Sequence, residues 1–301
     1  MPAQIPYRRK MEFEYGSVAQ LSPNIRRVLA NNPSPFTFHG TGTYILGRGN
    51  VAVIDPGPAL PEHVDAILAA TKGETISHVL ITHTHNDHSP AWQLLKAHCP
   101  AKTYAYGPHG AGKLEQGIAV EEGGDFQFQP DIRVKDGDII QGDGWSVECV
   151  YTPGHTSNHM CFQLREEKCL FTGDHVMGWS TSIISPPDGD MKQYMASLEL
   201  LLKRDDARYW PTHGPCIDDT RGLVSAFIEH RRDREAQIIS SLKSGIHQIR
   251  AMVPGMYVDL PEFMYPAAAR SVFAAVAYLV ETGRITCDGE LSIDARYSLV
   301  E

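Results

Sequence analysis

The chain lacks most features that mark secreted, membrane-spanning or nucleic-acid-binding proteins. Its six cysteines include no CxxC pair, which argues against a disulfide framework or a cysteine zinc site. No stretch approaches the roughly 20 apolar residues of a membrane helix, and no apolar segment follows the basic residues near the N-terminus. The net charge of −9 does not match nucleic acid or an anionic membrane. We therefore expect a cytoplasmic protein that does not bind membranes.

Several catalytic motifs are missing as well. The sequence contains no GxSxG nucleophile elbow, no P-loop and no GxGxxG dinucleotide signature. This excludes the common serine-hydrolase, nucleotide-phosphate and dinucleotide sites. The chain has 301 residues, of which 42% are hydrophobic, enough for one large domain and one small one.

Local patterns predict helices outside a mixed β-sandwich, an α+β fold. Helices are predicted over 61–71, 89–98 and 188–205, the last one capped by Asp190. Strands are predicted over 42–47, 50–57, 78–83, 102–106, 132–134, 146–151, 160–164, 168–171 and 207–215. Beyond about residue 220, helices over 222–245 and 266–285 flank a short helical piece, and a hairpin with Asp288-Gly289 at its tip follows. This order is typical of a winged helix-turn-helix module.

The segment ITHTHNDHSP, residues 81–90, contains three histidines and an aspartate within six positions. His83 and His85 are two residues apart at the end of an apolar strand, so they project to one side. Asp87 and His88 follow in the next turn. Imidazole and carboxylate groups are ligands for Zn²⁺, Fe or Mn. An HxHxDH pattern of this density predicts a metal site.

Three more donors stand where predicted strands end in tight turns. His155 follows Pro-Gly in YTPGHTSNH, Asp174 follows Gly173 in LFTGDH, and His213 precedes Gly in YWPTHGP. Each is weak evidence alone, because a lone loop histidine is common. Their recurrence together with HxHxDH predicts that several strand ends converge on one site.

This set of motifs resembles the metallo-β-lactamase superfamily over roughly residues 35–220. The resemblance implies an αβ/βα sandwich with a two-metal site along one edge. It assigns the first ion to His83, His85 and His155. It assigns the second ion to Asp87, His88 and His213, and it gives Asp174 the role of a bridge between the two ions. All seven positions are filled.

The same resemblance gives three residues candidate catalytic roles. Asp55, in VIDPGP, matches the first family motif, a carboxylate that orients the site; a turn aspartate is the alternative. His159 has a counterpart near the site in the superfamily, so a supporting or substrate role competes with a structural one. Asp87 is a ligand that could also move a proton.

Within the superfamily the sequence resembles the β-lactamase-like protein 2 branch. The features that carry this are residues 171–201 after the bridging aspartate, EHRRDREAQI at 229–238, and the helical tail. The resemblance implies a catalytic domain over 1–220 and a winged-helix-like domain over 221–301. Residues 178–184, GWSTSII, follow Asp174 and form either a substrate-facing loop or an ordinary surface loop.

The resemblance leads us to expect a metal-dependent hydrolase. Two divalent ions, zinc with iron or manganese as alternatives, can share a water and lower its pKa. The resulting bridging hydroxide would attack a small ester, thioester or related acyl substrate. An endoribonuclease of single-stranded RNA is the alternative that the branch keeps open. An iron-dependent sulfur dioxygenase is a third, but it needs only one iron, whereas both ligand sets are intact.

The C-terminal tail does not have the charge of a DNA-binding module. Residues 226–301 contain 8 Lys and Arg against 10 Asp and Glu, a net of −2, whereas DNA binding depends on several cations. This argues against a DNA-binding regulator. We expect the tail to pack on the catalytic domain, shape its pocket or form a homodimer contact. The basic cluster HRRDR, residues 230–234, is expected on a solvated helix face.

Overall fold

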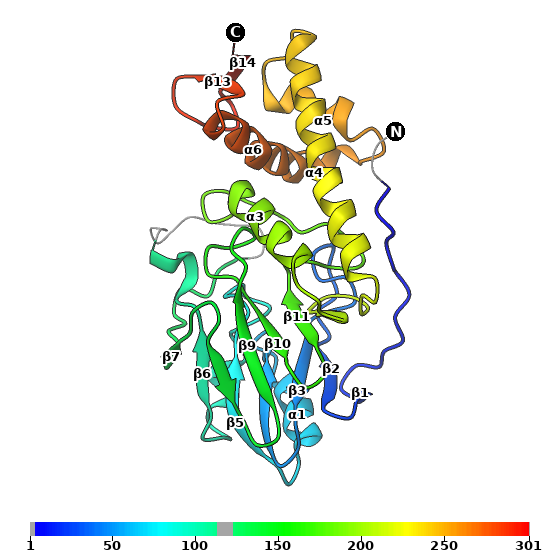
Figure 1. Ribbon diagram of the computed structural model, residues 1–301, viewed down its shortest axis with the longest axis vertical. Helices are drawn as coiled ribbons and strands as arrows, with labels where there is room; N and C mark the ends of the chain where they lie inside the picture. The colour runs from blue at the N-terminus through cyan, green and yellow to red at the C-terminus, as the bar shows by residue number, and fades with distance from the viewer. Residues whose placement is uncertain (1–3, 113–122, 301) are drawn as a thin grey trace.

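The computed structural model describes residues 4–112 and 123–300, and it contains two stacked β-sheets with helices on their outer faces (Figure 1). The larger sheet has the order β1 (Val18–Ser22), β2 (Ile25–Leu29), β3 (Gly42–Leu46), β4 (Asn50–Ile54), β5 (Thr75–Leu80), β6 (Lys102–Ala105), β7 (Ile132–Arg133). The smaller has the order β12 (Arg208–Pro211), β11 (Cys169–Gly173), β10 (Met160–Leu164), β9 (Ser146–Tyr151), β8 (Ile139–Gln141). Both sheets mix parallel and antiparallel pairs, as the sequence predicts.

Strand alternation divides the core into layers. Successive side chains of a strand point to opposite faces, so Tyr44 and Leu46 of β3 pack between the sheets with Trp145 and Phe171. Ile45 faces the other way. It packs in the layer under α1 (Pro61–Ala70) and α2 (Trp92–Leu95). The larger sheet is therefore buried on both faces.

The smaller sheet is covered by α3 (Met191–Leu202) and by the first part of α4 (Thr220–Lys243). The predicted cap of α3 is confirmed, since Asp190 Oδ1 accepts the Gln193 N–H at 2.9 Å. Leu198 of α3 and Phe227 of α4 pack in the same core layer as Leu170 of β11.

The C-terminal elements form a core of their own at one end of the molecule (Figure 1). They are the later part of α4, α5 (Ile249–Met256), η2 (Glu262–Met264), α6 (Tyr265–Glu281) and the hairpin of β13 (Ile285–Asp288) and β14 (Arg296–Leu299). Helix α4 places Phe227 in the layer on the smaller sheet and Ile238 in this C-terminal core. One continuous helix thus joins the sandwich to the C-terminal elements.

Several predicted elements are shorter at their site end, and the strands predicted over 50–57 and 207–215 end at Ile54 and Pro211. The strand predicted over 78–83 is wrong in its bounds, because β5 starts at Thr75 and ends at Leu80. The Thr82 N–H donates to Asp55 Oδ1 at 2.8 Å, so a side chain takes the place of a neighbouring strand. The helix predicted over 89–98 shrinks to α2, because the Trp92 and Gln93 N–H groups donate to the Ser89 and Pro90 carbonyls three residues back, which forms a turn and not an α-helix.

The described residues include one helical stretch, 262–281, that is long and apolar enough to cross a membrane, with a mean hydropathy of 1.4. The expectation that no stretch approaches this threshold is therefore wrong. The criterion uses only length and composition, and buried core helices also meet it. Here 39% of the window is buried, and Val272 and Val276 pack in the C-terminal core.

Candidate metal centre

The candidate donors all follow the carboxyl ends of strands at one edge of the sandwich. β4 and β5 are parallel neighbours in the larger sheet, and β11 and β12 are parallel neighbours in the smaller. In the larger sheet, Asp55 follows β4 and residues 83–88 follow β5. In the smaller sheet, His155 follows β9, Asp174 follows β11 and His213 follows β12. Segments up to 158 residues apart in the sequence, from Asp55 to His213, therefore meet at this edge.

His83, His85 and His155 form the first group of donors. His85 Nδ1 lies 2.9 Å from His83 Nε2 and 3.2 Å from His155 Nε2. Two ligands of a tetrahedral zinc ion lie about 3.3 Å apart, given Zn–N distances near 2.0–2.1 Å. Burial, reinforced by neighbouring histidines, holds the pKa of His83 and of His85 well below its usual value. Both rings are therefore neutral and keep a lone pair for a metal ion.

Asp87, His88 and His213 form the second group. Asp87 Oδ2 lies 3.0 Å from His213 Nε2 and 3.4 Å from His88 Nε2. Burial opposes a charge on His213, but Asp174 and Asp87 together raise its pKa to about 10. The carboxylates of Asp174 and Asp87 thus favour a positive charge beside them.

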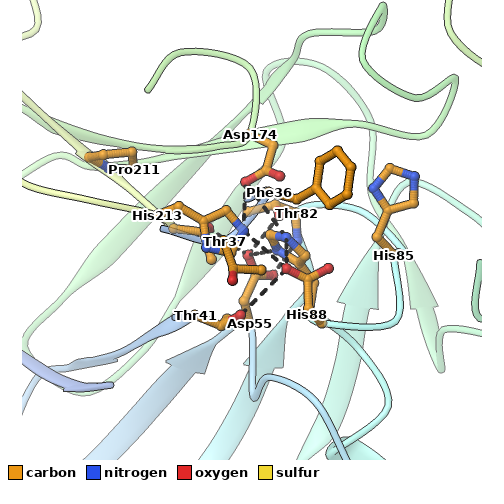
Figure 2. Close-up of polar contacts among 12 residues, drawn as sticks. Phe36, Thr37, Thr41, Asp55, Thr82, His85, His88, Asp174, Pro211 and His213 are labelled. Atoms are coloured by element: carbon orange, nitrogen blue, oxygen red, sulfur yellow. Dashed lines mark hydrogen bonds and ion pairs between the residues drawn. The ribbon is translucent and has the colours of Figure 1, made fainter. Parts of the chain in front are cut away.

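Asp174 lies between the two groups: it contacts His88 and His213 of the second group (Figure 2) and His155 of the first. Its Oδ1 is 3.4 Å from His213 Nε2 and 3.6 Å from His88 Nε2. Its Oδ2 is 3.8 Å from His155 Nε2. A single carboxylate with one oxygen toward each group has the geometry of a bridge.

Two buried atoms at the centre have no hydrogen-bond partner among the described residues, namely His88 Nε2 and Asp174 Oδ1. A buried polar atom without a partner costs about 1–3 kcal/mol, so a fold rarely keeps two of them facing each other. A cation between them would satisfy both. The histidine and aspartate donors therefore fit two divalent ions such as Zn²⁺, Fe²⁺ or Mn²⁺.

Asp55 holds His88 from behind (Figure 2). It is fully buried, and its Oδ2 accepts hydrogen bonds from His88 Nδ1 at 2.9 Å, Thr82 Oγ1 at 2.7 Å and Thr212 Oγ1 at 3.0 Å. These bonds tie the turns after β5 and β12 to the end of β4. They also fix the ring of His88 so that Nε2 faces the centre.

Backbone carbonyls orient two other histidines. His155 Nδ1 donates to the Ile183 carbonyl at 2.6 Å, and His213 Nδ1 donates to the Gly40 carbonyl at 3.1 Å. In each case the bond leaves Nε2 directed at the carboxylates of the centre. Neither partner was identified from the sequence, because a carbonyl acceptor leaves no residue-type signal.

His159 lies next to the centre without reaching the pocket. Its ring is fully buried, its Nε2 accepts the Asp174 N–H at 3.3 Å, and its Nδ1 lies 2.9 Å from Thr152 Oγ1. It is not among the described residues that line the pocket. This geometry makes it a support for the Asp174 backbone, and a substrate role for His159 stays a prediction.

A pocket of about 240 Å³ opens onto the centre. Its lining comprises the donors Asp87, His155, Asp174 and His213 and, in addition, Ser34, Phe36, Thr37, Asn86, Met177 and Ile183. Within residues 178–184, Ile183 lines this pocket, and the substrate-facing role of the loop stays a prediction. The sequence analysis did not identify residues 34–37 as part of the pocket. The available signal was the aromatic Phe36, which lies among Ser, Pro and Thr residues shortly before a strand.

The turn that carries His155 makes Gly154 a sensitive position. Gly154 has φ +138°, and a Cβ there would lie 2.3 Å from the Tyr194 Cα in α3. We expect Gly154→Ala to lower the free energy of unfolding by about 2–3 kcal/mol, because the backbone of α3 must move. Denaturant melts measure this change.

Gly144→Ala is the matched control, because Gly144 also has a positive φ (+74°) but a Cβ at this position would meet no atom within 4 Å. We expect it to cost only about 1 kcal/mol, the strain of a left-handed backbone. Equal losses in the two variants would contradict the steric explanation.

Comparisons with known proteins agree with this site. Residues 37–213 match the metallo-beta-lactamase superfamily. The atrochrysone carboxyl ACP thioesterase dmxR1 of a Cryptosporiopsis species is 34% identical over 79% of this chain and 69% of its own length. The beta-lactamase-like protein 2 homolog of Caenorhabditis elegans is 33% identical over 88% of this chain and 87% of its own.

A solved structure supports the same fold. A beta-lactamase domain protein from Burkholderia ambifaria, 17% identical, aligns with a TM-score of 0.79 over 98% of this chain and 97% of its own. The predicted α+β sandwich is thereby confirmed. The chain belongs to the metallo-beta-lactamase superfamily.

Proposed function

We propose that this protein is a two-metal hydrolase of thioesters or related small acyl substrates. The observation that carries the proposal is Asp174, a buried carboxylate with one oxygen toward each histidine group. Its unpartnered Oδ1 beside the unpartnered Nε2 of His88 is the arrangement that a bound cation would complete. The printed name of the Cryptosporiopsis relative, an acyl carrier protein thioesterase, favours an acyl substrate.

The proposed ligand sets follow the geometry. His83, His85 and His155 would hold one ion; Asp87, His88 and His213 would hold the other; and Asp174 would touch both. Zinc is the ion that we propose, since four-coordinate nitrogen and oxygen sites suit it. When bound, two such ions supply a water of lowered pKa and polarise the carbonyl oxygen of the substrate.

The chain's own residues would orient these donors and place the acyl group. Asp55 and the Ile183 carbonyl fix the rings of His88 and His155, so that little reorganisation is needed when substrate binds. Phe36, Met177 and Ile183 give the pocket an apolar wall beside the donors. That wall would hold an acyl chain and exclude water from its carbonyl carbon.

The described pocket lining favours this substrate class over RNA. It contains no lysine or arginine among the described residues, whereas RNA-binding grooves gather cations along the phosphate backbone. The volume of about 240 Å³ suits an acyl group rather than a nucleotide chain.

Metal content tests the proposal directly. We expect the purified protein to carry about two ions per chain by elemental analysis, because two donor groups are present. Chelation should abolish hydrolysis in a panel of thioesters, lactones, phosphodiesters and RNA, and zinc should restore it. Fewer than one ion per chain in an active protein would refute the two-metal mechanism, and cleavage of RNA alone would refute the acyl substrate.

A further inference from the structure

The loop of residues 177–184, which we call the wall loop, lines the pocket with Met177 and Ile183, and Ile183 also contacts a candidate ligand. The Ile183 side chain lines the pocket, and the Ile183 carbonyl accepts the His155 Nδ1–H at 2.6 Å. The position of this residue therefore sets both the shape of the pocket and the orientation of a candidate ligand. Whatever holds the wall loop also holds His155.

Helix α4 holds the wall loop through Arg231. The Arg231 Nη2 donates to the Ser182 carbonyl at 2.5 Å, one residue before Ile183. The guanidinium also lies over the ring of Tyr194 in α3, 5.2 Å from its centroid. At the other end of the loop, the Arg8 N–H donates to the Gly178 carbonyl at 2.8 Å. A continuous set of contacts thus leads from α4 to His155.

Arg231 is a charged residue of α4 whose side chain is buried. It is only 7% exposed, and among the described residues its guanidinium forms no ion pair. Burying a charge without a carboxylate partner is costly. Among the described residues, the Ser182 carbonyl and the side chain of Tyr194 offset part of this cost. The predicted solvated face is therefore wrong for Arg231, whereas the side chain of Arg232 is 63% exposed. The hydrogen bond from Arg231 to the Ser182 carbonyl gives this buried charge a role, which is to order the wall loop.

We propose that Arg231 is a positioning residue through which α4 fixes the wall loop and the orientation of His155. The proposal rests on the proposed function, because it takes His155 as a metal ligand. It makes α4, the helix that also enters the C-terminal core, part of the active site.

Arg231→Met tests this role, with Arg232→Met as the matched control on the same helix. Methionine keeps an unbranched chain against Tyr194 but removes the charge and the donor. We expect zinc to bind about tenfold more weakly at the tighter site of Arg231→Met, the lower end for loss of an orienting partner. Arg232→Met should bind zinc as the wild-type protein does.

Fluorine NMR of 5-fluorotryptophan-labelled, metal-free protein gives a readout that needs neither metal nor substrate. Trp179 lies in the wall loop and stacks on Phe38 at 4.8 Å, and its resonance can be assigned with Trp179→Phe. We expect this resonance to broaden or shift in Arg231→Met and to stay unchanged in Arg232→Met. A wild-type protein that binds no zinc would overturn the proposed function, while this spectrum would still decide the role of Arg231.

Arg231→Lys covers the case in which the methionine variant does not fold. Lysine keeps the charge, but its single Nζ cannot both reach the Ser182 carbonyl and cover the Tyr194 ring. We expect zinc affinity between those of wild type and Arg231→Met, with a shifted Trp179 resonance. Folded Arg231 variants that match Arg232→Met in both zinc affinity and Trp179 resonance would overturn the proposal.

Discussion

His88→Ala is expected to lower hydrolysis by at least about 100-fold while the fold survives. His88 is a donor of the second group that also faces Asp174. Its Nε2 faces both Asp87 and Asp174, and its Nδ1 is held by Asp55. Removing the ring should also reduce the metal content from about two ions per chain to about one. Steady-state kinetics and elemental analysis of the same preparation measure both effects.

The control for this variant is His98→Ala, because His98 is an exposed histidine outside the centre. We expect it to keep wild-type activity and metal content. Circular dichroism should show the same secondary structure for both variants. Full activity of His88→Ala at matched metal content would remove the second donor group from the mechanism.

Asp55→Asn is expected to lower the free energy of unfolding by about 3 kcal/mol and to weaken metal binding. The Asp55 carboxylate accepts four hydrogen bonds, from the Thr82 N–H, from two threonine hydroxyls and from His88. An amide replaces one acceptor oxygen with a donor, so at least one buried donor must lose its partner. Urea denaturation with and without added zinc separates the loss of fold stability from the loss of metal affinity.

Asp131→Asn is a closely matched control for Asp55→Asn. Asp131 accepts the N–H and the hydroxyl of Thr103, both at 2.8 Å, just as Asp55 accepts both groups of Thr82. Asp131 is exposed, however, so water can replace a lost bond. We expect a cost below about 1 kcal/mol and no change in metal binding. A similar cost in both variants would show that burial of the Asp55 network contributes little.

Sequence patterns were sufficient for the chemistry-bearing residues, because their signals are local. Three histidines and an aspartate within residues 83–88 are a dense set of donors, and each further donor stands where a strand pattern breaks at Gly or Pro. The Asp190 cap of α3 is a similar case, since a cap and its helix are neighbours in the chain. The order and approximate bounds of most strands followed from short apolar runs bounded by turn residues.

The end of β5 depended instead on a partner far along the chain. Whether Thr82 continues a strand depends on where the Asp55 carboxylate lies, and these residues are 27 positions apart. Local propensity cannot include such a partner, so the predicted strand ran into the turn.

The sequence by itself identified the candidate donors, the sandwich and the order of most of its elements, but not the strands β1, β2 and β8. Only the tertiary structure decided which backbone carbonyls orient His155 and His213, which loops form the pocket, and that Arg231 is buried while Arg232 is exposed. The physical reason is that every residue type offers the same carbonyl oxygen. Which carbonyl meets a given ring or guanidinium is therefore set by how the strand ends and α4 pack, and not by residue identity.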